Sequence, residues 1–138
     1  MGGTVTLIGT RNGDGQVCKA ANQIIVGVTV QAVANPIKVQ QALMGGAASS
    51  TILQNHGARM LAGDFEPGFR AELQQKDLRV VLSAARDLGV VLPLAATAEG
   101  LYNALTARGR AKEDHSAIVT ILGELAACKV APLGKDTS

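Results

Sequence analysis

The chain has 138 residues, a formal net charge of +2, 47% hydrophobic residues and 2% aromatic residues. This length suits one domain, and the two cysteines are too few to hold a chain of this size together as a disulfide scaffold. High apolar content with low charge argues against an intrinsically disordered chain, and a near-neutral charge balance without aromatic stacking residues argues against a nucleic-acid-binding protein.

Hydrophobic periodicity and capping residues predict an all-α domain that begins with a short strand. In chain order, the first predicted elements are a strand at 4–9 and a glycine-rich turn at 9–15. Three helices follow, from Gln16 to about Val33, from Asn35-Pro36 to Gly45-Gly46, and from Ser49 or Ser50 to Met60. The last three helices run from about Arg70 to Leu88, from Pro93 to Gly109, and onward from a cap at Asp114. A turn is predicted at 64–69. The first helix is apolar almost all round after Asn22, and such a helix is normally central and buried.

Three of the later helices carry apolar positions at helical spacing, which predicts the faces that they bury. The expected core faces are Leu78, Val81, Leu82, Ala85 and Leu88 in one helix, Leu94, Ala98, Leu101 and Leu105 in the next, and Ile118, Leu122 and Leu125 in the last. From Lys129 onward the chain is polar, and we expect a loose tail.

Targeting signals are sparse in this sequence. Met1-Gly2-Gly3 is not the start of a basic and then apolar secretory signal. The longest apolar run, Ile24 to Val33, is interrupted by glycine and polar residues, so no membrane span is expected. Cys18 and Cys128 are interpreted as free thiols of a cytoplasmic protein that has neither a membrane nor a nucleic acid as partner.

The start of the long helix carries the strongest candidates for chemistry. Gly13-Asp14-Gly15 begins like a dinucleotide fingerprint, but the third glycine position holds Cys18 and no strand–helix–strand unit follows. The glycine-rich start of this helix is still compatible with an anion-binding site. Lys19, Asn22 and Gln23 share one helix face. Taken alone, Lys19 is either a solvated lysine, the commoner case, or a general acid–base group.

Two further segments contain residue types that are common in active sites. Asp114-His115-Ser116 has the letters of a catalytic triad, but consecutive residues cannot adopt its geometry. His56 is a lone histidine without partner spacing, and the histidines and cysteines are scattered, so no metal site is predicted. Lys76-Asp77, taken alone, indicates a solvated charged face.

The run from Gly13 to Gln23 resembles the catalytic signature of the β-hydroxyacid dehydrogenase family, in which Gly-x-Gly is followed by three residues, a lysine, two residues and an asparagine. Stretches that match the same family in order are Ala42–Gly46, Phe65–Phe69, Lys76–Leu78 and Asp114–Ala117. The resemblance covers about residues 1 to 127 and is closest to the 2-hydroxy-3-oxopropionate (tartronate semialdehyde) reductases and 3-hydroxyisobutyrate dehydrogenases of that family.

The resemblance implies an all-α helical bundle of the 6-phosphogluconate dehydrogenase C-terminal type. Residues 13–127 would form the substrate-binding and dimerisation domain, 1–12 would be a remnant of the end of a Rossmann domain, with its short strand, and 128–138 would be the loose tail. Lys19 would be the catalytic lysine, which hydrogen-bonds the substrate oxygen and supplies the proton. The substrate-binding residues would be Asn22, Gly15, Phe69 and Asp77, and the residues that contact the cofactor, NAD or NADP, would be Lys76 and Phe69.

Two differences from the family pattern shape the expected function. A Rossmann domain precedes this region in the family and is absent from this sequence, and the family's central helix continues about three turns past the position of Val33. We therefore expect a catalytic-lysine domain of an NAD(P)-dependent oxidoreductase, which reduces 2-hydroxy-3-oxopropionate or oxidises 3-hydroxyisobutyrate-like hydroxyacids and is inactive without the Rossmann domain. Its partners would be a small hydroxyacid or semialdehyde and either further copies of the chain, as in a dimer, or a separate Rossmann domain. A non-catalytic helical oligomerisation module and a truncated gene fragment are the alternatives.

Overall fold

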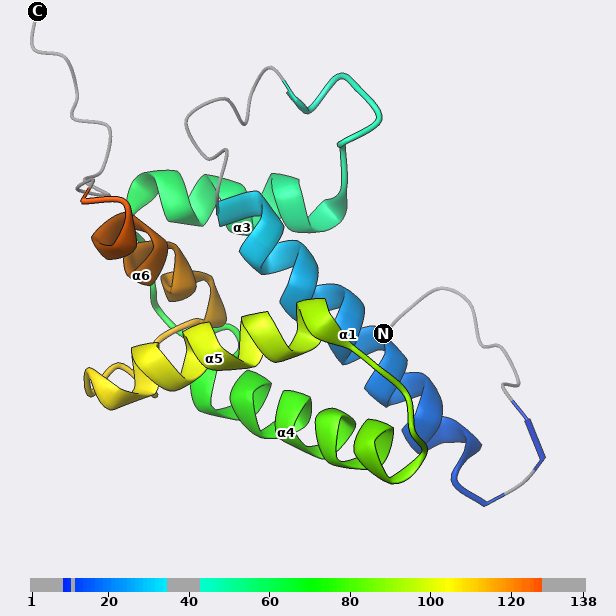
Figure 1. Cartoon of the computed structure of the whole chain (residues 1–138). Helices are drawn as coiled ribbons and strands as arrows, with labels where there is room; N and C mark the ends of the chain where they lie inside the picture. The colour runs from blue at the N-terminus through cyan, green and yellow to red at the C-terminus, as the bar shows by residue number, and fades with distance from the viewer. Residues whose placement is uncertain (1–8, 11, 35–42, 128–138) are drawn as a thin grey trace, which may run out of the picture.

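The computed structural model describes residues 9–10, 12–34 and 43–127, and these form an all-α domain (Figure 1). Its elements are α1 (Asp14–Ala34), α3 (Thr51–Ala62), α4 (Ala71–Asp87), α5 (Pro93–Ala107), the short 3₁₀ helix η2 (His115–Ala117) and α6 (Ile118–Leu125). The predicted fold class is confirmed. Over the described ranges no residue lies in a strand, and one isolated antiparallel bridge joins Arg70 to Asp114.

Three predicted segments lie mainly outside the described residues. The strand at 4–9 overlaps them only at Gly9, which belongs to no regular element. The helix predicted from Asn35 overlaps them only from Leu43, where a turn follows. The tail from Lys129 is not among them, and neither is Cys128.

The helix boundaries follow the predicted capping residues. Ser50, rather than Ser49, caps α3, and its hydroxyl oxygen accepts the Leu53 backbone N–H at 3.0 Å. Gly89 and Gly109 follow α4 and α5 with φ of +67° and +79°, a left-handed conformation in which glycine is the favoured helix stop. These local signals explain why the predicted ends lie within a few residues of the observed ones.

Helix α1 is central, as predicted, but it is not buried all round. It packs against α3, α4, α5 and α6 through one side, whose buried residues are Gln23, Gly27, Val30, Val33 and Ala34. The opposite side is exposed at Val17 and Ile25, which are 69% and 65% exposed. The prediction of all-round burial was therefore wrong, because the described helices cover only one side of α1.

By length and composition alone, α1 is apolar enough to cross a membrane, although no such stretch was expected from the sequence. This is weak evidence, since the core helix of a soluble protein passes the same test. The side of α1 that packs on the other helices includes a buried glutamine, Gln23, that bonds to α4.

A pair of buried glutamines joins α1 to α4. The Gln74 Nε2 donates to the backbone oxygen of Gln23 at 3.1 Å, and the Gln23 Nε2 donates back to Gln74 Oε1 at 3.4 Å. Gly27, one turn further along α1, leaves room for this contact, because a Cβ there would lie 2.8 Å from Gln74 Nε2. Helices α1 and α4 can therefore approach each other closely at the level of the predicted site.

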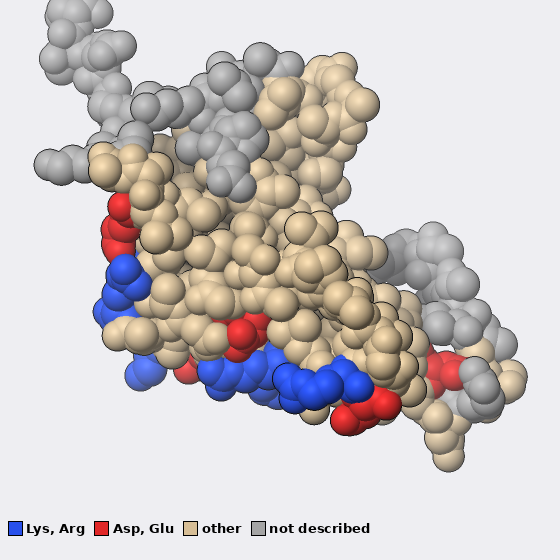
Figure 2. Space-filling model, in the orientation of Figure 1, with Lys and Arg blue, Asp and Glu red and all other residues tan. Residues whose placement is uncertain are grey.

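Helices α4 and α5 form an antiparallel pair along one edge of the domain (Figure 1). Arg79 bridges them by donating to Glu99 Oε1 at 3.1 Å and Asn103 Oδ1 at 2.7 Å. Figure 2 shows that acidic and basic side chains alternate along this edge, while most of the same face carries no charge. The charges on this face therefore do not form a patch of one sign.

Most positions of the predicted core faces are buried or partly buried, and three positions are exposed. The predicted residues Leu78, Ala98, Leu105 and Ile118 are fully buried, and Tyr102 joins them in the core. The exposed exceptions are Leu88 at 78%, Leu94 at 62% and Leu125 at 73%. Each lies in the first or last turn of its helix or just past it, where the neighbouring helix no longer covers it.

Gly27→Ala should destabilise the domain. The new Cβ would lie 2.8 Å from Gln74 Nε2 and 3.4 Å from the Leu78 methyl groups, and overpacking of this kind typically costs about 1–3 kcal/mol. Gly100→Ala on α5 is the matched control, because open space surrounds that position and alanine favours a helix over glycine by about 1 kcal/mol. Urea unfolding should show a lower free energy of unfolding for the first variant and a higher one for the second; stabilisation by both would contradict the close packing.

Candidate functional site

The predicted face of α1 carries the candidate lysine. Lys19, Asn22 and Gln23 are at i, i+3 and i+4 of one continuous helix, so they do share a face. Lys19 is exposed, and its Nζ lies 5.8 Å from the centroid of the Phe69 ring. This distance is within the range of a cation–π contact. The structure thus brings the lysine together with a residue fifty positions away that the resemblance also implied.

A chain of polar contacts leads from α1 to Asp77 on α4. Asn22 Nδ2 donates to Gln23 Oε1 at 3.1 Å, and Gln23 Nε2 donates to Asp77 Oδ2 at 2.8 Å. Gln23 is 4% exposed, so this bond forms largely out of water. Asn22 and Asp77 are therefore held on one site through Gln23, which the sequence marked only as a neighbour of the lysine motif.

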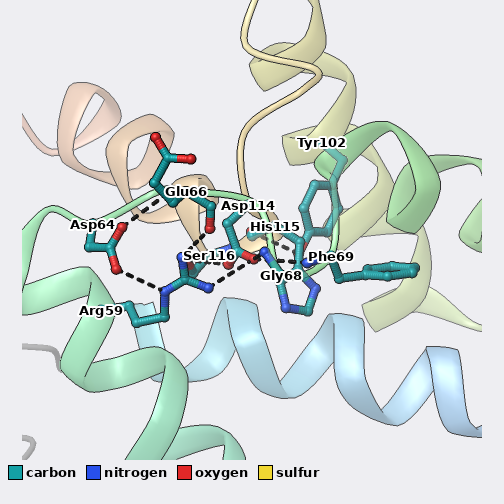
Figure 3. Close-up of polar contacts among 9 residues, drawn as sticks. All are labelled: Arg59, Asp64, Glu66, Gly68, Phe69, Tyr102, Asp114, His115 and Ser116. Atoms are coloured by element: carbon teal, nitrogen blue, oxygen red, sulfur yellow. Dashed lines mark hydrogen bonds and ion pairs between the residues drawn. The ribbon is translucent and has the colours of Figure 1, made fainter.

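Asp114 anchors the loop that carries Phe69 (Figure 3). Its Oδ2 accepts the backbone N–H groups of Gly68 at 2.9 Å and Phe69 at 3.1 Å. Its Oδ1 accepts the N–H of Ser116 at 3.1 Å and the hydroxyl at 2.6 Å. The guanidinium of Arg59, from α3, lies 3.1 Å from Oδ2. This carboxylate is 1% exposed, and its five donors satisfy the buried charge.

The electrostatics of Asp114 follow from these contacts. Burial raises the pKa of the carboxyl group, but the hydrogen bonds from Ser116 and Phe69 outweigh it, so that its pKa lies below the usual value. Arg59 also pairs with Asp64 at 3.4 Å and donates to the backbone oxygen of Glu66. One arginine therefore ties α3, the 64–69 turn and Asp114 together.

The prediction that Asp114 caps the last helical segment is confirmed, and the triad is excluded by contacts as well as by spacing. Asp114 caps η2, which leads directly into α6. The Ser116 hydroxyl donates to Asp114, while both ring nitrogens of His115 are buried without a hydrogen-bond partner among the described residues. His115 therefore has no contact through which it could act as a base for Ser116.

His56 is not isolated, contrary to the sequence-based interpretation. Its ring lies edge-on to that of His115, with centroids 4.6 Å apart, and His115 in turn lies 5.5 Å from the Phe69 ring. Burial lowers the pKa of His115 to about 4, although the Asp114 carboxylate opposes this shift. Burial likewise lowers the pKa of His56. The pair comes from α3 and η2, so only the tertiary fold reveals it.

The same cluster is the best candidate for a metal site in the described part of the chain. One ligand atom each from His56, Asp114 and His115 lies within 4.8 Å of the others. A divalent cation fits this set poorly, because the Asp114 oxygens already accept four hydrogen bonds and Arg59 places a positive charge 3.1 Å away. The His115 ring is better explained as a packing partner of Phe69, and the His56 ring as a packing partner of His115.

Gly15 and Lys76 lie at the edge of the site. Gly15 is exposed in the first turn of α1, and nothing described lies within 4 Å of an added Cβ, whereas Gly13 has a φ of +103° that favours glycine. Lys76 is exposed on α4 beside Asp77 and makes no hydrogen bond or ion pair with a described residue. The start of α1 already carries a carboxylate at Asp14, which supplies negative charge where an anion would bind.

Known proteins match this chain over most of its length. Residues 13–122 match the family described as "NAD-binding of NADP-dependent 3-hydroxyisobutyrate dehydrogenase". The chain is 46% identical to the 2-hydroxy-3-oxopropionate reductase of Escherichia coli K12, over 95% of this chain and 48% of that protein. It is 33% identical to the probable 3-hydroxyisobutyrate dehydrogenase-like 1, mitochondrial, of Arabidopsis thaliana, over 89% of this chain and 40% of that protein.

A solved structure agrees with these matches. The crystal structure of 3-hydroxyisobutyrate dehydrogenase from Salmonella typhimurium superposes with a TM-score of 0.77 at 29% identity, over 83% of this chain and 44% of that one. The chain spans less than half the length of each of these relatives.

Acidification from pH 6.5 to 4 should destabilise the domain through His115. Its pKa is about 4 in the fold and 6.5 as the ordinary value, so between these pH values the unfolded chain binds a proton that the folded chain does not. The free energy of unfolding should therefore decrease as the pH is lowered across this window, by up to roughly 3 kcal/mol from this residue. Below the window, protonation of Asp114 adds a separate loss.

His115→Gln removes this titration and should flatten the pH dependence between 6.5 and 4. Urea unfolding of both proteins at several pH values measures the difference. His56, Arg59 and Asp114 face the ring, so a residual slope from His56 is expected in both proteins. Identical slopes for the two proteins would show that His115 titrates normally in the fold.

Proposed function

The chain belongs to the family described as the NAD-binding region of NADP-dependent 3-hydroxyisobutyrate dehydrogenase, and from this premise we propose that it carries the catalytic-lysine and substrate-binding part of an NAD(P)-dependent hydroxyacid oxidoreductase. The observation that carries the proposal is the convergence on one face of α1 of Lys19, Asn22 and Gln23, with Phe69 and Asp77 in contact with them. All five residues lie within the matched segment, 13–122.

The proposed substrate is 2-hydroxy-3-oxopropionate, which would be reduced at its aldehyde group. The support is the 46% identity to a reductase of that name. Oxidation of a 3-hydroxyisobutyrate-like hydroxyacid is the second possibility, supported by the 33% identical relative and by the matched family. Both substrates are small carboxylates, and the positive charge of Lys19 near the start of α1 suits such a ligand.

Lys19 would act as the proton donor. Its ammonium group is exposed and makes no hydrogen bond or ion pair with a described residue, so it can reach a substrate oxygen. A bound nicotinamide supplies the hydride. As the aldehyde carbon is reduced, Lys19 Nζ passes a proton to the carbonyl oxygen, which leaves an alcohol and a neutral lysine amine. Asn22 would orient the substrate by hydrogen bonding.

Two residues have side chains suited to contact the nicotinamide cofactor. The Phe69 ring is half-buried and offers a flat apolar surface, while Lys76 offers an exposed cation without a partner in the described part of the chain. These residues would contact NAD or NADP, and a Rossmann domain would bind the remainder of the cofactor. We propose that such a domain, or a second copy of the chain, is the partner of this one.

A non-catalytic assembly module is the second candidate. The specific observation is the exposed apolar surface, namely Val17 and Ile25 on α1 and Leu88, Val90, Val91 and Leu94 around the α4–α5 connection. Exposed apolar clusters commonly mark contact surfaces. A chain that self-associates in light scattering, and that shows no effect of Lys19 substitution in any reductase assay, would favour this candidate.

Lys19→Ala should strongly slow hydride transfer in a chimera in which this chain replaces the matching half of the E. coli reductase. Loss of a positioned general acid typically costs about 100-fold to 10,000-fold in rate, so kcat for reduction of 2-hydroxy-3-oxopropionate should fall by at least roughly 100-fold. Lys112→Ala, at an exposed lysine outside the site, is the matched control and should leave kcat unchanged. An active Lys19→Ala chimera would rule out the proposed role.

A further inference from the structure

The 64–69 turn, which delivers Phe69 to the site, has no regular structure of its own and depends on distant residues. Phe65 and Phe69 use their backbone oxygens to accept the N–H groups of Asp114 at 2.9 Å and His115 at 2.8 Å. The N–H groups of Gly68 and Phe69 both donate to the Asp114 carboxylate. Both polar groups of the Phe69 backbone are thus hydrogen-bonded, the N–H to the Asp114 carboxylate and the carbonyl oxygen to the His115 N–H.

The side chain of Phe69 is supported by the same segment. His115 lies edge-on to the Phe69 ring at 5.5 Å, and His56 backs His115 at 4.6 Å. Because His115 is 3% exposed and neither ring nitrogen has a hydrogen-bond partner among the described residues, its imidazole acts here as a flat packing surface. Figure 3 shows His115 and Phe69 projecting from this corner over the α1 ribbon.

Crowding at this corner leaves the turn little freedom. A Cβ on Gly68 would lie 3.4 Å from Arg59 Nη1 and 3.5 Å from Asp114 Oδ2, so the turn is packed directly against the ion pair. Lys19 is held independently, because α1 is joined to α4 through Gln23 and Gln74. A change at Asp114 should therefore displace Phe69 without displacing the lysine.

We propose that Asp114 and His115 are positioning residues, which fix the Phe69 ring beside Lys19 and thereby shape the substrate side of the site. Asp114 sets the backbone of Phe69, and the His115 ring sets its side chain. Neither residue needs to touch substrate. The proposal rests on the proposed function only for its effect on catalysis, since the placement of Phe69 can be measured without any reaction.

The first test observes the ring directly by NMR of the full chain. The wild type should show nuclear Overhauser contacts between the Phe69 ring protons and the Lys19 ε-methylene, together with a ring-current shift of that methylene. Both signals should be lost in Asp114→Asn, whose amide cannot accept all four hydrogen bonds, and in His115→Ala. They should persist in His115→Phe, which restores a ring, and in Glu99→Gln, which breaks an ion pair remote from this corner.

The second test uses the reductase chimera and separates positioning from folding. In folded Asp114→Asn and His115→Ala chimeras, kcat should fall by about tenfold or more while His115→Phe stays near wild type, because small misplacements of site groups are costly. If Asp114→Asn does not fold, the two His115 variants decide. Folded variants that keep the Lys19–Phe69 contacts would overturn the proposal. An inactive wild-type chimera with the NMR results as expected would instead contradict the proposed function.

Discussion

Two buried glutamines hold together the helices on which the candidate site is built. Gln23 and Gln74 exchange hydrogen bonds between α1 and α4, and Gly27 provides the space that this contact needs. An amide buried without partners would cost free energy, so the pair strongly favours one register of the two helices. That register places Asp77 within 2.8 Å of Gln23, and with it the polar chain that ends at Asn22. The pair therefore joins the α1 side of the site to its α4 side.

The opposite border of the site depends on a buried charge. Asp114 would be unstable in the interior by itself, and it is tolerated because backbone amides, a hydroxyl and Arg59 surround it. Loss of one partner leaves the remainder uncompensated, so this corner forms as a unit. The lysine, by contrast, is exposed at the surface. The site therefore combines buried, hydrogen-bonded neighbours with an exposed lysine, an arrangement that suits the proposed contact of Lys19 with a substrate oxygen.

Much of the fold follows from local signals, whereas the site contacts do not. Ser50, Pro93 and Gly89 act within a few residues of themselves, and so the boundaries they predict agree with the structure. Periodicity identifies Leu78 and Leu105 as core, but it cannot tell where a neighbouring helix ends, and Leu88 is exposed for that reason. The shared face of Lys19 and Asn22 could be read from spacing. The contacts of Gln23 with Gln74, and of His56 with His115, join distant segments and carry no local pattern.

The chain contains one tyrosine and no tryptophan, so a single residue dominates its near-ultraviolet absorbance, and that residue lies at the segment that anchors Phe69. Tyr102 is fully buried, with its hydroxyl donating to the backbone oxygen of His115 at 3.2 Å. Burial raises the pKa of its phenol, so that the ring stays neutral in alkaline solution while the fold persists. Its near-ultraviolet absorbance and fluorescence therefore report on one location, the segment that anchors Phe69. The protein carries a natural optical label at this corner, and no dye or engineered residue is needed to follow it.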